Sequence, residues 1–413
     1  MADKVSCDVL PEGVLTVEQA QTLILAGVRA ITTTECVELK QAAGRVLAED
    51  LQAGFDVPPH CNSSMDGYAF AHASLMQQAP LMQIGSSWAG HPYQGRVQLG
   101  ECVRIMTGAC LPQGADTVEM QENTIKNGLE ISFLRLPKLG ENVRYPGEDL
   151  KQGETILSNG RKLTAADIGL IASLGMAEVK VLRKPRIAFF STGDELKQAG
   201  TPLGWGEIYD SNRYTLNALL QELPVEVLDL GIIPDQAEAV EHAFFQAQSQ
   251  ADLLITSGGV SVGDADFVTS TLNKLGKVKF WKMAMKPGKP LAHGVLGDCL
   301  FFGLPGNPVS VMATFLLFVR PAILKLAGHP ITEPHTYTAT TLTPIKKIPG
   351  RKDYQRGIYT QTAQGYQVQT TGKQESHMLR SMSQANCFIV LERETSDLEA
   401  GSLVSILPFA SFS

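Results

Sequence analysis

Three glycine-bearing turns follow apolar runs within residues 251–310, with the sequences TSGGVSVGDADF, MKPGKP and GLPGNPVS. Glycine lets backbone amides approach a bound anion because no side chain intervenes. Asp264 and Asp266 could hold a hard cation through their oxygens, and Lys286 and Lys289 flank a Pro-Gly turn and add positive charge. Together these residues predict a site for a phosphorylated or oxyanionic ligand with a divalent metal.

The positive charge of the chain is unevenly distributed. Six lysines and no acid lie between Lys274 and Lys289, although the formal net charge of the protein is -7. The segment favours a small anionic ligand, whereas the acidic balance of the whole chain argues against general nucleic-acid binding. The first three lysines could also form a solvated face of an amphipathic element. The Pro-Gly turn favours a binding role for Lys286 and Lys289.

Acidic side chains follow two further apolar runs. RIAFF leads into STGDEL, where Asp194 or Glu195 could bind magnesium or act as a base, and VEVLDLGIIP leads into Asp235. A helix N-cap is the competing interpretation of STGDEL, because Ser, Thr and Asp are favoured there. Magnesium prefers oxygen ligands and often bridges to phosphates, so acids beside anion-binding turns suit it.

Other motifs are weaker when taken alone. GLPGNPVS places Asn307 near the start of an apolar helix, whose free amides could face an anion, but its Pro-Gly and Asn-Pro pairs also fit an ordinary turn. Ordinary turns likewise explain SSMDGYAF with Asp66, RIMTGA with Thr107 and PGEDL with Asp149. The chain has no Walker A, H-E-x-x-H or G-x-G-x-x-G motif.

Length and composition indicate a multidomain globular protein. The 413 residues, 44% of them hydrophobic, exceed what one core usually fills. Seven cysteines without a C-x-x-C pair, and no apparent signal peptide, predict a cytoplasmic location. The longest apolar run, Val309 to Val319, stops at Arg320-Pro321, which is too short for a bilayer and predicts a buried helix without membrane association.

Helix and strand signals divide the chain. Thr16 with Gln19 predicts a capping box before a helix from Val17, and Thr164 with Asp167 predicts another. Gly175 is expected to cap the second helix. Between the two helices, short apolar runs broken by glycine and proline predict an inserted β domain.

The second half of the chain alternates strands, turns and helices from residue 186 onward, which predicts a doubly wound α/β domain. Its apolar runs are continuous, as expected for strands covered on both faces. Ligands bind such sheets beyond the carboxyl ends of the strands, where the polar clusters lie. After residue 330, five short alternating segments predict a C-terminal β domain: YTATTLT, YQRGIYTQ, GYQVQTT, CFIVLER and SLVSILPF.

Seven motifs in order, NSSMDGYAF, RIMTGA, PGEDL, STGDEL, SGGVSVGDADF, MKPGKP and GLPGNPVS, resemble those of the molybdopterin molybdenumtransferase family, which includes bacterial MoeA and the E-domain of gephyrin. The resemblance implies a multidomain α/β plus β fold, in a homodimer with an intersubunit active site. The expected domains are an elongated helical domain (1–53 and 150–183), an inserted β domain (54–149), an α/β molybdopterin-binding domain (184–330) and a C-terminal β-barrel-like domain (331–413).

The activity implied is insertion of molybdate into adenylated molybdopterin, with Mg2+-dependent release of AMP. The resemblance places catalytic positions at Asp66, Thr107, Asp149, Glu195, Asp235, Asp266, Lys282 and Lys286, of which Glu195, Asp235 and Asp266 are expected to bind the metal. Substrate-binding positions are expected at Ser257, Gly258, Gly259, Lys289, Pro305, Gly306, Asn307, Pro308, Arg351, Arg356 and Ser381. An adenylating enzyme and cofactor-accepting molybdoenzymes are expected protein partners.

The chain departs from the family pattern at two places. Glu375 stands where relatives often have glycine, and Tyr145-Pro146 precedes G-E-D where they have arginines. Glu375 adds negative charge near the expected oxyanion site. Two alternative functions stay open: adenylyl transfer to molybdopterin, which would consume ATP, and a non-catalytic molybdopterin-binding scaffold.

Overall fold

The computed structural model describes residues 13–258, 271–272 and 277–412. Gly259, Asp264 and Asp266 therefore lie outside the described residues. The chain forms two compact units, the first containing residues 1–35, 44–46 and 181–413, and the second residues 36–43 and 47–180. The N-terminal helix thus packs in the first unit, although the expected domains group it with residues 150–183, and the four-domain partition stays a prediction.

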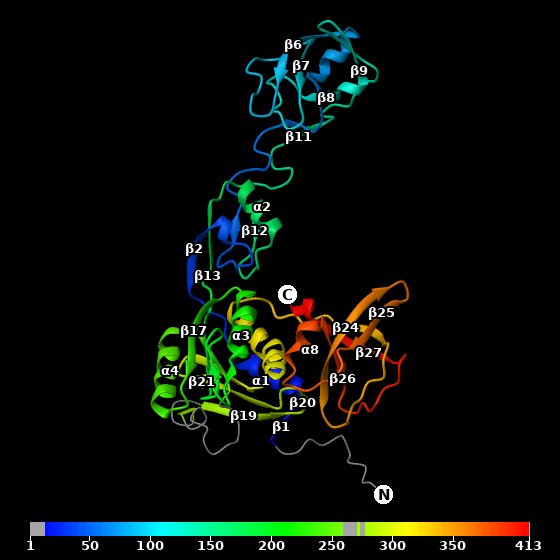
Figure 1. Ribbon diagram of the computed structural model, residues 1–413. Helices are drawn as coiled ribbons and strands as arrows, with labels where there is room; N and C mark the ends of the chain where they lie inside the picture. The colour runs from blue at the N-terminus through cyan, green and yellow to red at the C-terminus, as the bar shows by residue number, and fades with distance from the viewer. Residues whose placement is uncertain (1–12, 259–270, 273–276, 413) are drawn as a thin grey trace. The chain divides into compact units, whose positions relative to one another are not determined.

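A seven-stranded sheet forms the centre of the first unit, in the order β1-β19-β21-β22-β18-β14-β17 (Figure 1). Its strands are β1 (Val14–Leu15), β14 (Arg186–Thr192), β17 (Glu226–Ile233), β18 (Leu253–Ser257), β19 (Lys277–Met283), β21 (Pro290–Leu296) and β22 (Cys299–Leu304). The neighbours β17, β14, β18 and β22 are parallel, whereas β21 pairs antiparallel with both β22 and β19. The predicted strands of the α/β domain are confirmed.

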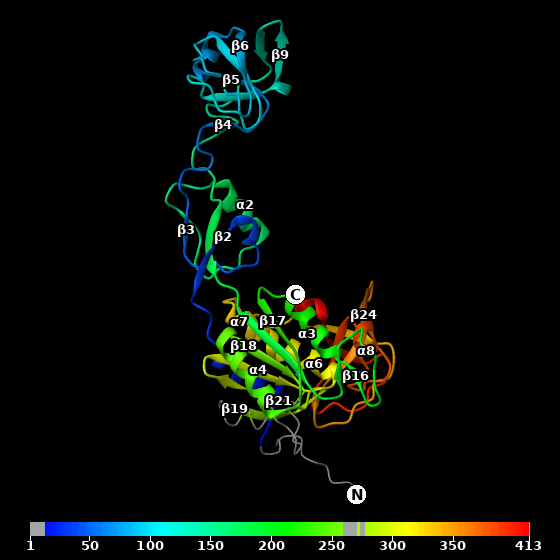
Figure 2. The same ribbon diagram turned by 60° about the vertical axis from the view of Figure 1, so that its left-hand side comes forward.

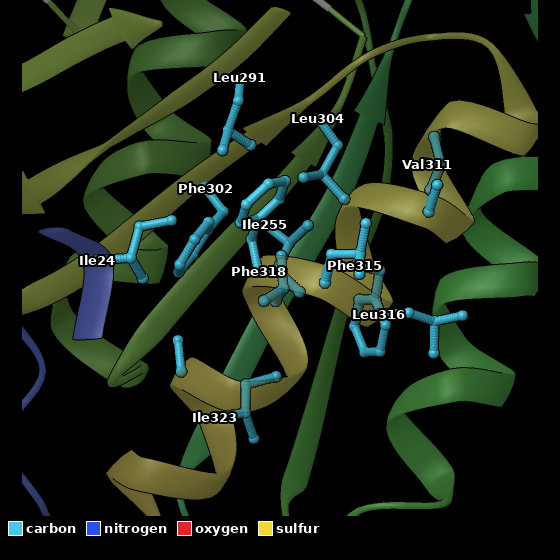
Figure 3. Packing of buried hydrophobic residues seen from close by; sticks show 14 of the residues in the cluster. Ile24, Ile255, Leu291, Phe302, Leu304, Val311, Phe315, Leu316, Phe318 and Ile323 are labelled. Carbon is cyan, nitrogen blue, oxygen red and sulfur yellow. The ribbon is translucent and has the colours of Figure 1, made fainter. Parts of the chain in front are cut away.

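Helices cover both faces of this sheet, as the continuous apolar runs predict. One face packs against α1 (Val17–Gly27), α3 (Ser211–Gln221), α6 (Pro308–Thr314) and α7 (Arg320–Leu326), and the other against α4 (Ala237–Gln250). Along β14, Ile187 and Phe189 belong to the first core, and Ala188 and Phe190 to the second. Figure 2 shows α4 on the sheet, and Figure 3 shows side chains of the sheet and helices meeting in the first core.

The apolar run forms a buried helix, as predicted, but the helix continues through Arg320-Pro321 and is longer than the run. The helix runs from Pro308 to Leu326, with a π-helical turn over Phe315–Val319. Pro321 lacks the N–H that would bond to the carbonyl of Leu317, and the side-chain amide of Gln21 in α1 donates to that carbonyl instead at 3.0 Å. The helix is long and apolar enough to cross a membrane, but its side chains are largely buried inside the core.

The five predicted C-terminal strands are confirmed and close on themselves as a barrel. They are β23 (Tyr337–Thr341), β24 (Lys352–Thr362), β25 (Gly365–Thr370), β26 (Cys387–Leu391) and β27 (Leu403–Pro408). Their order around the barrel is β24-β25-β23-β27-β26, and β26 pairs with β24 to close it. Closure leaves these strands without a free sheet edge. A two-residue strand, β20 (Met285–Lys286), pairs in parallel with β24.

The second unit contains a six-stranded sheet in the order β8-β5-β7-β6-β10-β9. Its strands are β5 (Gly67–Phe70), β6 (Leu81–Ser87), β7 (Glu101–Ile105), β8 (Thr117–Met120), β9 (Thr124–Asn127) and β10 (Glu130–Phe133). The unit also contains α2 (Ala165–Ser173). Short strands pair as β2 (Thr34–Glu38) with β13 (Glu178–Leu182), β3 (Leu51–Gln52) with β12 (Thr155–Leu157) and β4 (Asn62–Ser63) with β11 (Val143–Arg144). The predicted capping boxes of α1 and α2 are both present, and Gly175, with φ +73°, follows α2 as expected.

Gly67 begins β5 where no side chain fits. A Cβ there would lie 2.0 Å from the carbonyl oxygen of Glu119 on β8, so we expect Gly67→Ala to separate the two strands and destabilise this sheet by about 1–3 kcal/mol. Hydrogen exchange of the β5 and β8 amides measures the loss. Gly54→Ala is the matched control, because a Cβ at Gly54 meets nothing within 4 Å. Equal protection in both variants would contradict this account of the strand pairing.

Candidate functional site

A pocket of about 460 Å³ lies at the carboxyl edge of the parallel sheet in the first unit. Such a volume suits a small-molecule ligand. It is lined by Gly258, Met285, Lys286, Pro287, Gly288, Lys289, Pro290, Pro305, Gly306, Asn307, Ser310, Arg351, Gln374, Glu375 and Ser376. The structure therefore brings together seven of the predicted site residues: Gly258, Lys286, Lys289, Pro305, Gly306, Asn307 and Arg351.

Three cationic side chains reach the pocket from two parts of the chain. Lys286 and Lys289 are exposed on either side of the Pro-Gly turn. Arg351 belongs to the barrel and reaches them because β20 and β24 pair in parallel, with Met285 opposite Lys352. The fold thus concentrates positive charge at one point, as an anion site requires.

Two glycines let the turns pack closely around the pocket. Gly258 has φ +90°, and a Cβ there would lie 2.8 Å from the carbonyl oxygen of Thr192. Gly288 has φ +101°, and its Cβ would lie 2.8 Å from the Thr314 side chain. By contrast, a Cβ at Gly306 would meet nothing within 4 Å, so this turn leaves open space beside the pocket.

Asn212, at the start of α3, supports the site from outside its lining and is absent from the sequence motifs above. Its side-chain amide donates to Ser257 Oγ at 2.9 Å and to the carbonyl of Gly306 at 2.7 Å. It therefore ties together two of the predicted turns. The signal in the sequence is YDSNRYT, in which Asp210 caps α3 by accepting from the N–H of Arg213.

Several buried oxygens at the same edge of the sheet have no partner within the described part of the chain. They are Ser191 Oγ, Thr192 Oγ1, Asp210 Oδ2, Asn212 Oδ1 and Thr256 Oγ1. An unpaired buried polar atom costs about 1–3 kcal/mol, so such a group calls for an explanation. These unpaired oxygens gather where β14, β18 and α3 meet, and their residues are not part of the pocket lining.

Asn307 is the N-cap of α6, as predicted, but it makes no side-chain capping bond. The N–H of Val309 donates to the carbonyl of Ser376 at 3.1 Å and is not free for an anion. Pro308 has no N–H and is not among the residues that line the pocket. The expectation of free helix amides is therefore wrong for these first two positions.

Arg356 and Ser381 lie behind the pocket lining. Arg356 is 1% exposed, and burial lowers its pKa to about 10. Its guanidinium donates to Ser381 Oγ at 3.0 Å and to the carbonyls of Gln374 and Glu375 at 3.2 and 3.0 Å. These bonds hold the segment 374–376 in place. A direct contact of Arg356 or Ser381 with an oxyanion stays a prediction.

The acids of STGDEL meet Asp235 beyond β14 and β17. The N–H of Asp235 donates to Asp194 Oδ1 at 3.3 Å. Burial, followed by repulsion from Asp194 and Glu195, raises the pKa of Asp235 above its ordinary value. The helix N-cap alternative for STGDEL is wrong, because the motif leads into the short strand β15 (Leu196–Lys197).

These acids supply oxygen ligands whose mutual repulsion a cation would relieve, which fits magnesium. No group of three His, Cys, Asp or Glu side chains suited to a metal occurs in residues 13–258, 271–272 and 277–412. The predicted ligand Asp266 lies outside those ranges. Lys282 is exposed on β19, opposite Val14 and Pro290, and does not line the pocket.

In the second unit, Asp66 and Thr107 form a polar pair. Asp66 Oδ1 accepts from the backbone N–H and from the hydroxyl of Thr107, both at 2.8 Å. These two bonds lower the pKa of the Asp66 carboxyl. Asp149 is exposed, and its backbone N–H donates to the carbonyl of Val57. Asp66 is thus held as a carboxylate with its second oxygen available.

The hydroxyl of Thr107 can be removed without changing the shape of its side chain. We expect Thr107→Val to raise the pKa of Asp66 part of the way to its ordinary value, since the backbone N–H bond remains. NMR titration of the carboxyl group measures the change. Thr124→Val is the control, because the Thr124 hydroxyl donates to the carbonyl of Gln121. An unchanged Asp66 titration in Thr107→Val would refute the role of the hydroxyl bond.

Family models match three consecutive parts of the chain. The MoeA N-terminal region (domain I and II) matches residues 15–175, a probable molybdopterin binding domain matches residues 188–325, and the MoeA C-terminal region (domain IV) matches residues 338–409.

Known relatives resemble the chain over most of its length. It is 47% identical to a molybdopterin molybdenumtransferase of Haemophilus influenzae, over 96% of this chain and 98% of the relative. It is 33% identical to gephyrin of Dictyostelium discoideum, over 90% of this chain and 59% of gephyrin. A crystal structure of a molybdopterin biosynthesis MoeA protein from Pyrococcus horikoshii OT3 has a TM-score of 0.80 and 28% identity, covering 96% of this chain and all of that one. The chain therefore belongs to the molybdopterin molybdenumtransferase family, as its sequence motifs predict.

Proposed function

We propose that the protein inserts molybdate into adenylated molybdopterin and releases AMP, which completes the molybdenum cofactor. The observation that carries the proposal is the pocket in which Lys286, Lys289 and Arg351 converge beside glycine turns, in a chain 47% identical to a molybdopterin molybdenumtransferase. Molybdate and the substrate phosphates are anions, and such a site stabilises them through charge and backbone amides.

Each part of the site has a proposed role. The turns at Gly258, Gly259 and Gly306 bind the pterin phosphate, while Lys286 and Lys289 balance the charge of molybdate.

Glu195, Asp235 and Asp266 are proposed to hold magnesium, which when bound would supply Lewis-acid stabilisation of the phosphoanhydride of the substrate. The raised pKa of Asp235 supports this role, since a cation would relieve the repulsion among the acids. The lysine side chains then neutralise the charge that develops on the departing phosphate.

The proposed active form is a cytoplasmic homodimer. In it, Asp66, Thr107 and Asp149 of one subunit would complete the site of the other, which would account for functional positions that the family resemblance places in motifs distant in sequence. The adenylating enzyme would supply the substrate, and molybdoenzymes would receive the product. Release of AMP from adenylated molybdopterin, without consumption of ATP, separates this function from adenylyl transfer and from a non-catalytic scaffold.

Lys286 provides the first test of the proposed site. We expect Lys286→Ala to reduce molybdate-dependent AMP release about 100-fold, because a positioned charge in the transition state is lost. Single-turnover assays with adenylated molybdopterin, molybdate and Mg2+ measure the rate. Lys162→Ala, an exposed lysine of the second unit, is the control and should keep the full rate. Full activity of Lys286→Ala would remove Lys286 from the mechanism.

Asp235 tests the metal assignment. We expect Asp235→Asn to raise the Mg2+ concentration for half-maximal AMP release about tenfold or more, because a charged ligand is lost. In the wild type, Mg2+ affinity should fall as the pH is lowered through the raised pKa of Asp235, since protons then compete with the cation. Asp298→Asn, in the turn between β21 and β22, is the control. The same Mg2+ dependence in both variants would exclude Asp235 as a ligand.

A further inference from the structure

Glu375 places a negative charge in a pocket whose other charged lining residues are all cationic. Among the described lining residues, the charged groups are Lys286, Lys289, Arg351 and Glu375. Three positive charges and one negative charge give these lining residues a net charge of +2. Glu375 is exposed, so its carboxylate is available to a ligand or to solvent rather than buried in the protein.

The backbone that carries Glu375 is fixed from two sides. Buried Arg356 donates to the carbonyls of Gln374 and Glu375, and its own backbone N–H donates to Gln374 Oε1 at 2.7 Å. On the other side, the carbonyl of Ser376 accepts from the N–H of Val309 at the start of α6. The segment therefore keeps Glu375 at the pocket wall instead of letting it swing away with a flexible loop.

We infer that Glu375 is a specificity-determining residue that matches the charge of the pocket to a small dianion. This inference rests on the proposed function. Without Glu375, the described lining would carry three cations and no acid, which would favour more highly charged anions because Coulomb attraction grows with ligand charge. With Glu375 present, the two negative charges of a tetrahedral dianion such as molybdate balance the net charge of the lining. The additional affinity of anions with higher charge is then reduced. The carboxylate thus weakens anion binding in general but improves selection by charge.

Direct binding tests the inference. Sodium molybdate and sodium pyrophosphate are titrated into the full-length protein by calorimetry at constant ionic strength. Glu375→Gln should lower the Kd of molybdate about three- to tenfold and that of pyrophosphate by a larger factor. The variant keeps the main-chain carbonyl that Arg356 binds, so the segment should stay in place. Glu399→Gln, an exposed residue of the barrel, changes the total charge equally and should alter neither Kd.

The outcomes separate this inference from the proposed function. If the wild type binds molybdate and Glu375→Gln binds it equally or more weakly, Glu375 has no such role, while the anion site stands. Glu375 likewise has no such role if Glu375→Gln lowers the Kd of both anions by the same factor, because selection by charge is then absent. If the wild type binds neither anion and Glu375→Gln does not restore binding, the anion pocket and this inference both fall.

Discussion

The candidate site depends on a short parallel pairing between β20 and β24. The two strands share only two residue pairs, Met285 with Lys352 and Lys286 with Asp353. They nevertheless bring the barrel to the edge of the α/β sheet and place Arg351 beside the Pro-Gly turn. Without this pairing, the lysines of the turn would lack both the arginine and the segment that carries Glu375. The cation cluster is therefore a product of contact between two β structures.

Buried polar groups support the pocket from behind. Arg356 is almost fully buried, which costs desolvation energy, and its hydrogen bonds to carbonyls and to Ser381 offset part of that cost. Asn212 also supports the pocket, because its side-chain amide donates to Ser257 at the end of β18 and to the carbonyl of Gly306 in the turn after β22. Both residues hold backbone segments in place, so the residues that line the pocket can keep their own polar groups for a ligand.

Local patterns predicted most helices and strands of the first unit, including those of its barrel. Strand patterns and capping boxes depend on residues that lie close together in the sequence. They did not indicate that the apolar helix continues through Pro321, where the donor that replaces the missing helix bond comes from Gln21, 296 residues before the carbonyl that it reaches. They left two interpretations of STGDEL open, because Ser, Thr and Asp favour helix caps, and the structure excludes the helix cap. At Pro321 the deciding partner lies far away in the sequence, whereas at STGDEL it is the nearby strand β16 (Ile208–Tyr209), which pairs in parallel with β15.

The sequence by itself determined which residues could bind an anion, because glycine turns, lysines and acids at strand ends are local signals. Only the tertiary structure decided which of them act together. It placed Lys286, Lys289 and Arg351 around one pocket, left Lys282 outside its lining, and buried Arg356 as a support. The physical reason is that side-chain type and turn geometry depend on neighbours along the chain, whereas convergence and burial depend on how distant strands pair and pack.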